Sequence, residues 1–248
     1  MSDHCQELVA KADKDRFLSC LFAPEDARSH LFALYAFNVE IARIRATVSE
    51  PQIGLVRQQW WLDTIDGIYA SRTPDHPVAQ ALTIAIEKGD LPKHALLNLI
   101  IAREFDLYDD PMPTLSDLEG YLGETSSSLI QMAALILGKG AAEAAGLAGV
   151  AFGLAGVLRL QKPRYLPSDM VQILGAKETI NQLCTHTRKR LAEARALRGN
   201  IPTSVMAAFL PVSLTELYLK RIERGGALEV SQLRRQFALW RAARNNRF

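Results

Sequence analysis

Polar and charged side chains interrupt an otherwise apolar helical pattern in the segment AFNVEIARIRATVSE, residues 36–50. The segment brings Asn38, Glu40, Arg43 and Arg45 among apolar neighbours. Glu40, Arg43 and Arg45 could be surface charges, or they could pair with one another and with acids of other helices. Because charged residues on a helix are usually solvated or paired, the sequence favours a structural role for these side chains.

Pairs of acidic residues elsewhere have the spacing that a shared divalent cation requires. Asp106 and Asp110 read DxxxD, and Asp63 and Asp66 are three residues apart. Carboxylates three or four positions apart lie on one face of a helix and can hold one ion together. The proline after Asp110 predicts a helix end, and such spacings arise often by chance. These acids, together with Asp109, are therefore candidate metal ligands, but their spacing alone does not establish a metal site.

Thiol and imidazole chemistry is not indicated. The three cysteines, Cys5, Cys20 and Cys184, show no CxxC spacing, and Cys184 with His186 forms an isolated pair. This pattern favours neither a disulfide framework nor a zinc site and is typical of a reducing compartment. The segment 1–15, MSDHCQELVAKADKD, lacks the features of a secretion signal or a transit peptide, so we expect a cytoplasmic protein.

The composition is that of a folded protein with nearly balanced charge. Of 248 residues, 48% are hydrophobic and 23% are charged, and 29 basic against 27 acidic residues give a net charge of +2. This balance gives no argument for nucleic-acid binding. The last fifteen residues, RRQFALWRAARNNRF, differ because they hold five arginines and no acid. They predict a solvated helix with one docked face, or a basic contact with an anionic membrane or an acidic partner.

Helical periodicity runs along the whole chain, and its proline and glycine punctuation predicts about ten helices. They are expected at residues 24–50, 53–70, 77–89, 92–108, 114–138, 141–160, 177–197, 202–223 and 231–248. Thr114 or Ser116 is a candidate N-cap with Asp117 close behind. No linker separates the helices, so we expect a single all-α domain over 1–248. The uncharged run 144–158 is too short to span a bilayer comfortably and predicts a buried helix.

Glycine and hydroxyl-bearing residues predict two places of close approach. Gly146, Gly149, Gly153 and Gly156 follow at steps of three, four and three, so they share one face of a single helix. Either a neighbouring helix or a flat apolar ligand would lie against that face, since glycine within a helix is otherwise costly. The hydroxyls of residues 125–128, TSSS, line a cavity or bond back to helical carbonyls.

In order and spacing, several segments resemble the squalene/phytoene synthase family, the head-to-head branch of the all-α isoprenoid synthases. These segments are DRFLSCLFAPEDARSHLFALYAF (15–37), RQQWW (57–61), HPVA (76–79), AREFDL (102–107), YLGETSSSLIQMAALILG (121–138), GLAGVLRL (153–160) and YLP (165–167). The resemblance implies the isoprenoid synthase fold, a single helical bundle around a central apolar cavity. The stretch FNVEIARIRATVSEPQIGLVRQQWW is most similar to the branch that contains the mitochondrial complex I assembly factor and its bacterial relatives.

The resemblance also implies where the chemistry of the family would lie. Its enzymes hold magnesium through two acidic motifs, because the departing diphosphate needs cations bound by oxygen ligands. The first motif falls here on Ala42 and Ala46, with Val39 in place of a phosphate-facing arginine. The second falls on Leu160 and Arg164, with a helix-interrupting proline between them. These residues predict the loss of both magnesium-diphosphate motifs, and with it no metal and no cofactor.

Several other residues are candidates for a cavity or ligand site in this fold. They are Tyr35, Val39, Asp106, Tyr121, Ser127, Gly149, Gly153 and Gly156. For Asp106 and Tyr121 the alternative role is helix capping or core hydrogen bonding.

Together these features favour a non-catalytic squalene/phytoene-synthase-like protein that binds an apolar ligand or a partner in respiratory complex I assembly. The expected partners are an isoprenoid or lipid ligand, a respiratory-complex subunit or assembly factor, and, through the basic C-terminus, the surface of the inner membrane. Two alternatives stay open. One is an active prenyltransferase that acts on isoprenoid diphosphates with rearranged acids and magnesium, and the other is a purely structural helical scaffold.

Overall fold

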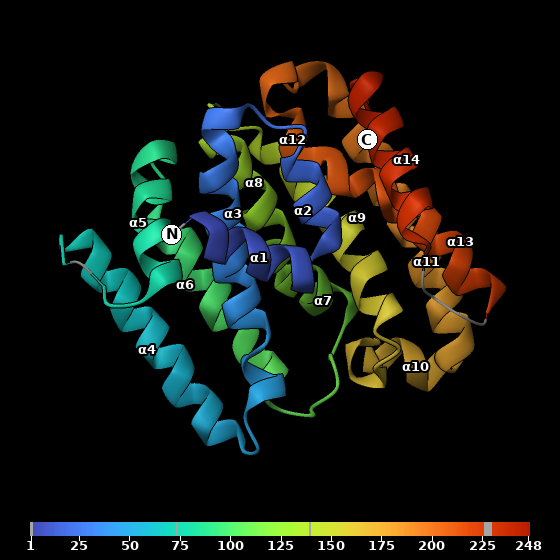
Figure 1. Cartoon of the computed structure of the whole chain (residues 1–248). Coiled ribbons are helices and arrows are strands. Elements are labelled where there is room, and N and C mark those ends of the chain that lie inside the picture. Colours follow the sequence, from blue (N-terminus) through green and yellow to red (C-terminus); the bar gives the residue numbers. More distant parts are fainter. Residues whose placement is uncertain (1, 73, 139, 226–229) are drawn as a thin grey trace. The chain divides into compact units, whose positions relative to one another are not determined.

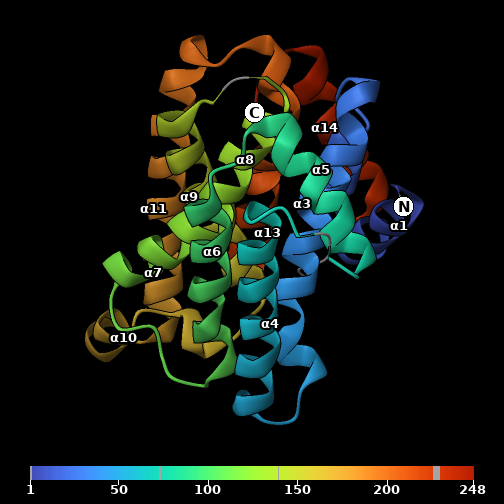
Figure 2. The same cartoon turned by 90° about the vertical axis from the view of Figure 1, so that its left-hand side faces the viewer.

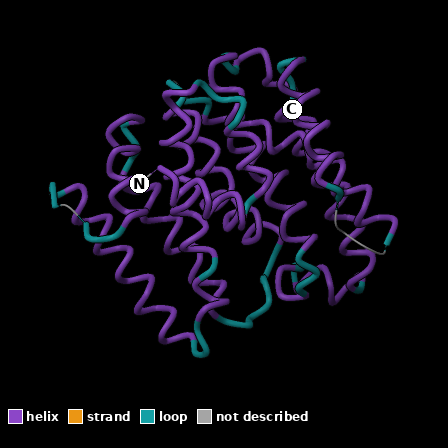
Figure 3. The backbone as a smooth tube through the Cα atoms, viewed as in Figure 1, coloured by secondary structure: helices purple, strands orange, loops and turns teal. Residues whose placement is uncertain are grey.

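The computed structural model describes residues 2–72, 74–138, 140–225 and 230–248 (Figure 1). Within these residues the chain forms fourteen α-helices, joined by short 3₁₀ turns and one π-helical turn, and no strand (Figure 3). The predicted all-α class is confirmed. The chain divides into two compact units, Met1–Asp109 with Met132–Gly140, and Asp110–Gln131 with Ala141–Phe248. The single domain over 1–248 and its central cavity stay predictions.

The first unit is centred on α3 (Glu25–Ala42), which contacts α1 and α5 and buries eleven of its residues. Because this helix is apolar on nearly every side, its neighbours fix it in place. α4 lies beside α6 (Figure 2). The elements of the unit besides α3 are α1 (Ser2–Ala12), α2 (Lys14–Cys20), η1 (Ile44–Thr47), α4 (Pro51–Tyr69), α5 (Pro77–Gly89), α6 (Lys93–Ala102), η2 (Arg103–Leu107) and the end of α8 (Ser128–Ile136).

The helix predicted for residues 24–50 is shorter than expected. It ends at Ala42, and the backbone continues as the 3₁₀ turn η1. There the Thr47 hydroxyl donates to the Ile44 carbonyl at 2.9 Å, which gives this carbonyl a partner outside an α-helix. Glu50 then turns extended in front of the proline that begins α4, as the proline predicts.

The end of α5 shows a second difference. The helix ends at Gly89 as predicted, but Asp90 adopts the left-handed conformation, with φ 45° and ψ 50°. Gly89 is needed for packing instead. A Cβ on this residue would lie 2.8 Å from Leu91 Cδ2 and 3.1 Å from the Ile136 nitrogen.

The second unit is centred on α9 (Ala142–Arg159), which contacts α11, α13 and the π-helical turn η3. Nine residues of α9 are buried, so the predicted buried helix is confirmed. The unit also holds α7 (Leu115–Leu122), η3 (Gly123–Ser127), the start of α8, η4 (Pro163–Tyr165), α10 (Ser168–Leu174), α11 (Ala176–Ala196), η5 (Leu197–Asn200), η6 (Thr203–Val205), α12 (Met206–Phe209), η7 (Leu210–Leu214), α13 (Thr215–Arg224) and α14 (Gln232–Arg244).

Two local features of the second unit bear on the predictions. The predicted N-cap is Thr114, whose hydroxyl accepts from the Asp117 nitrogen at 3.2 Å, while the Asp117 carboxylate accepts from the Thr114 nitrogen at 3.1 Å. This reciprocal capping box begins α7. Among the described residues, α9 is a helix long and apolar enough to cross a membrane, and 56% of its 18-residue window is buried, as in the core helix of a globular protein.

Candidate functional site

The place of the first acidic motif lies at the end of α3 in the first unit. Ala42 is the last residue of α3 and Ala46 lies in η1, so the two residues do not share one α-helix. Both alanines are exposed, whereas Val39 is 7% exposed and belongs to the core. Methyl and isopropyl groups supply no oxygen ligand, so these side chains do not fit a magnesium ion.

The charged residues around this place pair with acids. Glu40 and Arg43 form an ion pair of 2.6 Å, and Arg45 Nη2 lies 3.9 Å from a carboxylate oxygen of Asp109. The predicted structural pairing is therefore confirmed. Asp109 is 83% exposed, so its pair contributes little to stability.

Tyr35 and Asp106, two candidates in the first unit, are both buried. The guanidinium of Arg16 lies 5.6 Å from the ring centre of Tyr35, and burial raises the pKa of the Tyr35 hydroxyl. Asp106 accepts a hydrogen bond from Arg103 at 3.0 Å, an interaction of the kind that its core role predicts. Asp106 belongs to the 3₁₀ turn η2, which ends one residue later, so Asp106 and Asp110 do not share a helix.

The place of the second acidic motif lies at the end of α9 in the second unit. Leu160 is the C-cap of α9 and is 53% exposed, and Gln161 follows with φ 51°. The α-helix ends at Arg159, before Pro163, and Arg164 lies in the separate 3₁₀ turn η4, so Leu160 and Arg164 do not share an α-helix. The guanidinium of Arg164 lies 5.0 Å from the ring centre of Tyr165. An isobutyl and a guanidinium group hold no cation, so this place does not fit magnesium either.

Other carboxylates also have partners of their own. Asp66 pairs with Lys93 at 3.0 Å, and Asp63 accepts from Gln59 at 2.8 Å. Within the described part of the chain, no three His, Cys, Asp or Glu side chains are grouped so that they could hold a metal ion.

The glycine face of α9 meets the π-helical turn η3. A Cβ on Gly149 would lie 2.3 Å from the Ser127 Cα, and a Cβ on Gly153 would lie 2.7 Å from Leu122 Cδ2. A neighbouring helical segment therefore makes the close approach at these two glycines. Gly156 differs, because a Cβ there would meet no heavy atom within 4 Å.

The hydroxyls of η3 are buried beside this contact. Thr125 Oγ1 donates to the Tyr121 carbonyl at 2.7 Å, which is the predicted back-bonding within a helix. Ser127 Oγ donates to the Gly146 carbonyl on α9 at 2.7 Å, and Ser126 Oγ has no hydrogen-bond partner among the described residues. The second unit thus brings Tyr121, Ser127, Gly149 and Gly153 into one neighbourhood. A ligand role for any of the candidate cavity residues stays a prediction.

Sequence reasoning missed a charged cluster that joins α7 to α11. The Glu119 carboxylate accepts from Arg190 Nε at 2.6 Å and Nη2 at 2.9 Å, and lies 2.8 Å from His186 Nε2. The hydrogen bond from Arg190 lowers the pKa of Glu119. Arg190 also pairs with Glu193 at 3.0 Å, so the cluster is internally satisfied and ties two helices together. His186 therefore has Glu119 as its partner. Cys184, two residues before it, is a buried thiol whose pKa is raised to about 11 by that burial.

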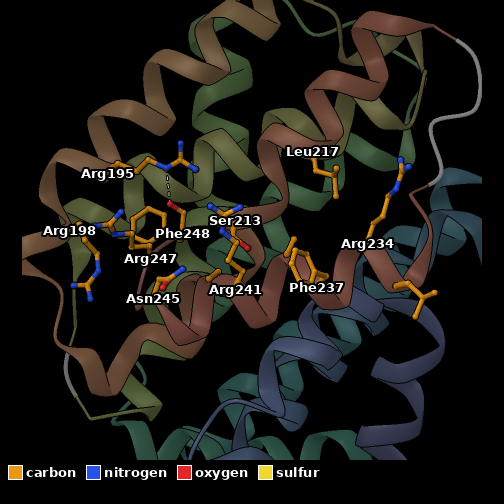
Figure 4. Close-up of a pocket in the computed structure, with 13 residues that line it drawn as sticks. Arg195, Arg198, Ser213, Leu217, Arg234, Phe237, Arg241, Asn245, Arg247 and Phe248 are labelled. Carbon is orange, nitrogen blue, oxygen red and sulfur yellow. Dashed lines mark hydrogen bonds between the residues drawn. The ribbon is translucent and has the colours of Figure 1, made fainter.

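A hollow of about 920 Å³ runs along α14 in the second unit (Figure 4). This volume is of the size that ligand pockets have. α14 forms one wall, and residues of α11, η5, η7 and α13 contribute to the rest. Leu239, which does not line the hollow, is fully buried, and Ala242, which lines it, is 8% exposed. The docked face predicted for the basic tail is confirmed, and the hollow adds a cavity that the sequence did not indicate.

Residues 9–241 match the model of the squalene/phytoene synthase family. The chain belongs to this family. Among solved structures, a ligand-bound dehydrosqualene synthase superposes with a TM-score of 0.85 at 17% identity, covering 99% of this chain and 96% of that one. A squalene synthase from Alicyclobacillus acidocaldarius superposes with a TM-score of 0.77 at 18% identity, covering 90% and 93%. At these identities the likeness establishes the isoprenoid synthase fold, as the resemblance implied.

Relatives with higher sequence identity to this chain are named as complex I assembly factors and not as synthases. The chain is 34% identical over 244 residues to bovine NADH dehydrogenase (ubiquinone) complex I, assembly factor 6, covering 89% of this chain and 73% of that protein. It is 33% identical over 247 residues to the human protein of the same name, covering 90% and 74%. The homologue from Drosophila melanogaster is 30% identical, covering 91% and 76%. The predicted similarity to the assembly-factor branch is confirmed.

Proposed function

We propose that this chain is a non-catalytic member of the family that takes part in respiratory complex I assembly by binding an apolar ligand or a protein partner. One observation carries the proposal: Ala42, Ala46, Leu160 and Arg164 occupy the two places where the resemblance puts magnesium-binding acids. The relatives that are named for complex I assembly support the second half of the proposal. Under it, the chain works in the cytoplasm at the surface of the inner membrane.

The missing oxygen ligands have a large effect on the reaction rate. Cations that neutralise a departing diphosphate stabilise the transition state by several kcal/mol. Each ~1.4 kcal/mol corresponds to about a tenfold change in rate. A chain that offers methyl, isobutyl and guanidinium groups at both places would therefore lose orders of magnitude in prenyl transfer, which favours a role in binding over a weakened catalytic role.

Deletion of the gene in the source organism tests the assembly role. We expect the deletion to lower the amount of complex I on native gels and a plasmid copy of the wild-type chain to restore it. An unchanged level of complex I after deletion would refute the assembly role, whatever the chain binds.

Variants of the Asp106–Arg103 pair distinguish a structural role of the Asp106 carboxylate from a catalytic one. Asp106→Asn and Arg103→Gln break the same 3.0 Å hydrogen bond between buried or half-buried side chains. If Asp106 is structural, both variants lower the melting temperature and the complex I level together. If Asp106→Asn alone abolishes complex I assembly while the two variants are equally stable, Asp106 has a chemical role and the non-catalytic proposal fails.

A further inference from the structure

The hollow along α14 is lined by arginine side chains. Its described lining includes no Asp or Glu side chain and five arginines: Arg195, Arg198, Arg234, Arg241 and Arg247. Figure 4 shows Arg195, Arg198 and Arg247 at one end of the hollow and Arg234 at the other, with Arg241 and Phe237 between them.

Two of these arginines are held in place by main-chain oxygens. Arg195 Nε donates to the Phe248 oxygen at 2.7 Å, and Arg198 donates to the Asn246 and Ile201 oxygens at 2.7 and 2.9 Å. The internal peptide carbonyls of Asn246 and Ile201 fix the Arg198 guanidinium without cancelling its charge. The acid that acts on Arg195, Glu216, is itself paired with Arg188 at 3.2 Å.

The guanidinium groups of Arg234, Arg241 and Arg247 form no ion pair with another described residue. Each therefore offers its full set of planar donors to a ligand. A planar guanidinium matches the two oxygens of a carboxylate, which makes arginine well suited to acidic partners.

The same helix exposes a stripe of large apolar side chains. Leu233, Phe237 and Trp240 are 78%, 61% and 47% exposed, and they stand at positions i, i+4 and i+7, on one side of α14. The Phe237 and Trp240 rings stack at 5.9 Å between centroids. Leu233 and Phe237 also line the hollow, so apolar surface and arginines border the same space.

The shape of this space favours a helix as the occupant. With thirteen residues, α14 offers a wall about 20 Å long at ~1.5 Å per residue. A helix can lie along such a groove with its apolar side chains on Phe237 and Leu217 and its acids on the arginines. A flat bilayer surface contacts protruding side chains but does not enter a hollow that has walls on two sides.

We propose that the hollow along α14 is a docking groove for an acidic amphipathic helix of a protein partner. This proposal specifies the class of protein partner that the chain would bind in complex I assembly, so it rests on the proposed function. Its direct test is a binding measurement that does not involve complex I.

The probe is a stapled helical peptide of about 14 residues, the length that matches α14. It has leucine at positions i, i+3, i+4 and i+7 and glutamate on the flanking positions. A second peptide replaces every glutamate with glutamine. Fluorescence anisotropy of the labelled peptides on the full chain should show binding of the acidic peptide that weakens with salt, and little binding of the neutral one.

Two matched triple variants locate the binding. Arg234→Gln/Arg241→Gln/Arg247→Gln should weaken binding of the acidic peptide by about tenfold or more, because three charge-assisted contacts are lost. The control, Lys162→Gln/Lys177→Gln/Arg224→Gln, removes the same charge from exposed residues of the same unit and should leave affinity within about twofold. An equal loss of affinity in both variants would mean that net charge alone attracts the peptide, and it would overturn the proposed docking groove.

Two other outcomes would also overturn it. The first is that the acidic and neutral peptides bind equally, or that neither binds. The second is that the acidic peptide does not bind while vesicles of phosphatidylglycerol and phosphatidylcholine bind the wild type and not the groove variant, which would assign the arginines to a membrane. If the peptide binds the groove but the groove variant restores complex I in the deletion strain, the groove stands and its link to assembly fails.

Discussion

Replacing single glycines of α9 with alanine should show where this helix is tightly packed and where there is space beside it. In Gly149→Ala the new Cβ would lie 2.3 Å from the Ser127 Cα, a main-chain atom that cannot rotate away. Overpacking of this kind costs roughly 1–3 kcal/mol and occasionally more. Alanine returns about 1 kcal/mol of helix propensity. Because the obstacle is backbone, the cost lies at the upper end, and we expect a net loss of about 2 kcal/mol.

Gly156→Ala is the matched control, because the same change on the same helix meets no heavy atom within 4 Å. It should keep the propensity gain of up to about 1 kcal/mol. For a chain of this size each kcal/mol moves the melting temperature by roughly 2–4 °C, so calorimetry should show a fall of about 4–8 °C for Gly149→Ala and a small rise for Gly156→Ala. If Gly149→Ala melts at or above the wild-type temperature, η3 does not press on α9 and the space there is open.

Three further predictions concern helix ends and charge. Thr114→Ala removes the capping box of α7 and should destabilise the chain by about 1 kcal/mol in urea titrations, and equal midpoints would contradict it. Gly89→Ala should also lower the urea midpoint, since its Cβ would lie 2.8 Å from Leu91 Cδ2. The folded pKa of Glu119 is lowered by Arg190, so its stabilising effect is present above the ordinary carboxyl pKa and is lost as pH falls through the lowered value. Glu119→Gln should therefore reduce the loss of stability between neutral and acidic pH, and an unchanged pH profile would refute the role of this pair.

Local signals in the sequence predicted the elements whose causes are themselves local. Pro77 and Thr114 begin helices because each meets the needs of a first helical turn by itself. α10 (Ser168–Leu174) was missed although Pro167 precedes it and Gly175, with φ 76°, follows it. Its seven residues are too few for helical periodicity to be visible.

Features that depend on distant parts of the chain were not predictable from the sequence. Glu119 and Arg190 are 71 residues apart, and the only hint of their cluster was that His186 and Arg190 stand at i and i+4 on one helix. The sequence predicted Gly89 as the end of the helix at 77–89, but it did not predict the packing against Ile136 that leaves no room for a side chain there. The hollow along α14 likewise depends on which elements fold against that helix, so the arginines alone indicated its charge and not its shape.

Release of diphosphate tests the central claim most directly. The purified full chain is incubated with farnesyl or geranylgeranyl diphosphate, magnesium and a reductant, with an active dehydrosqualene synthase as the positive control. Since Ala42, Ala46, Leu160 and Arg164 supply no oxygen ligand for magnesium, we expect diphosphate release no faster than in buffer without protein. Release well above that level that disappears when a chelator removes magnesium would contradict the account.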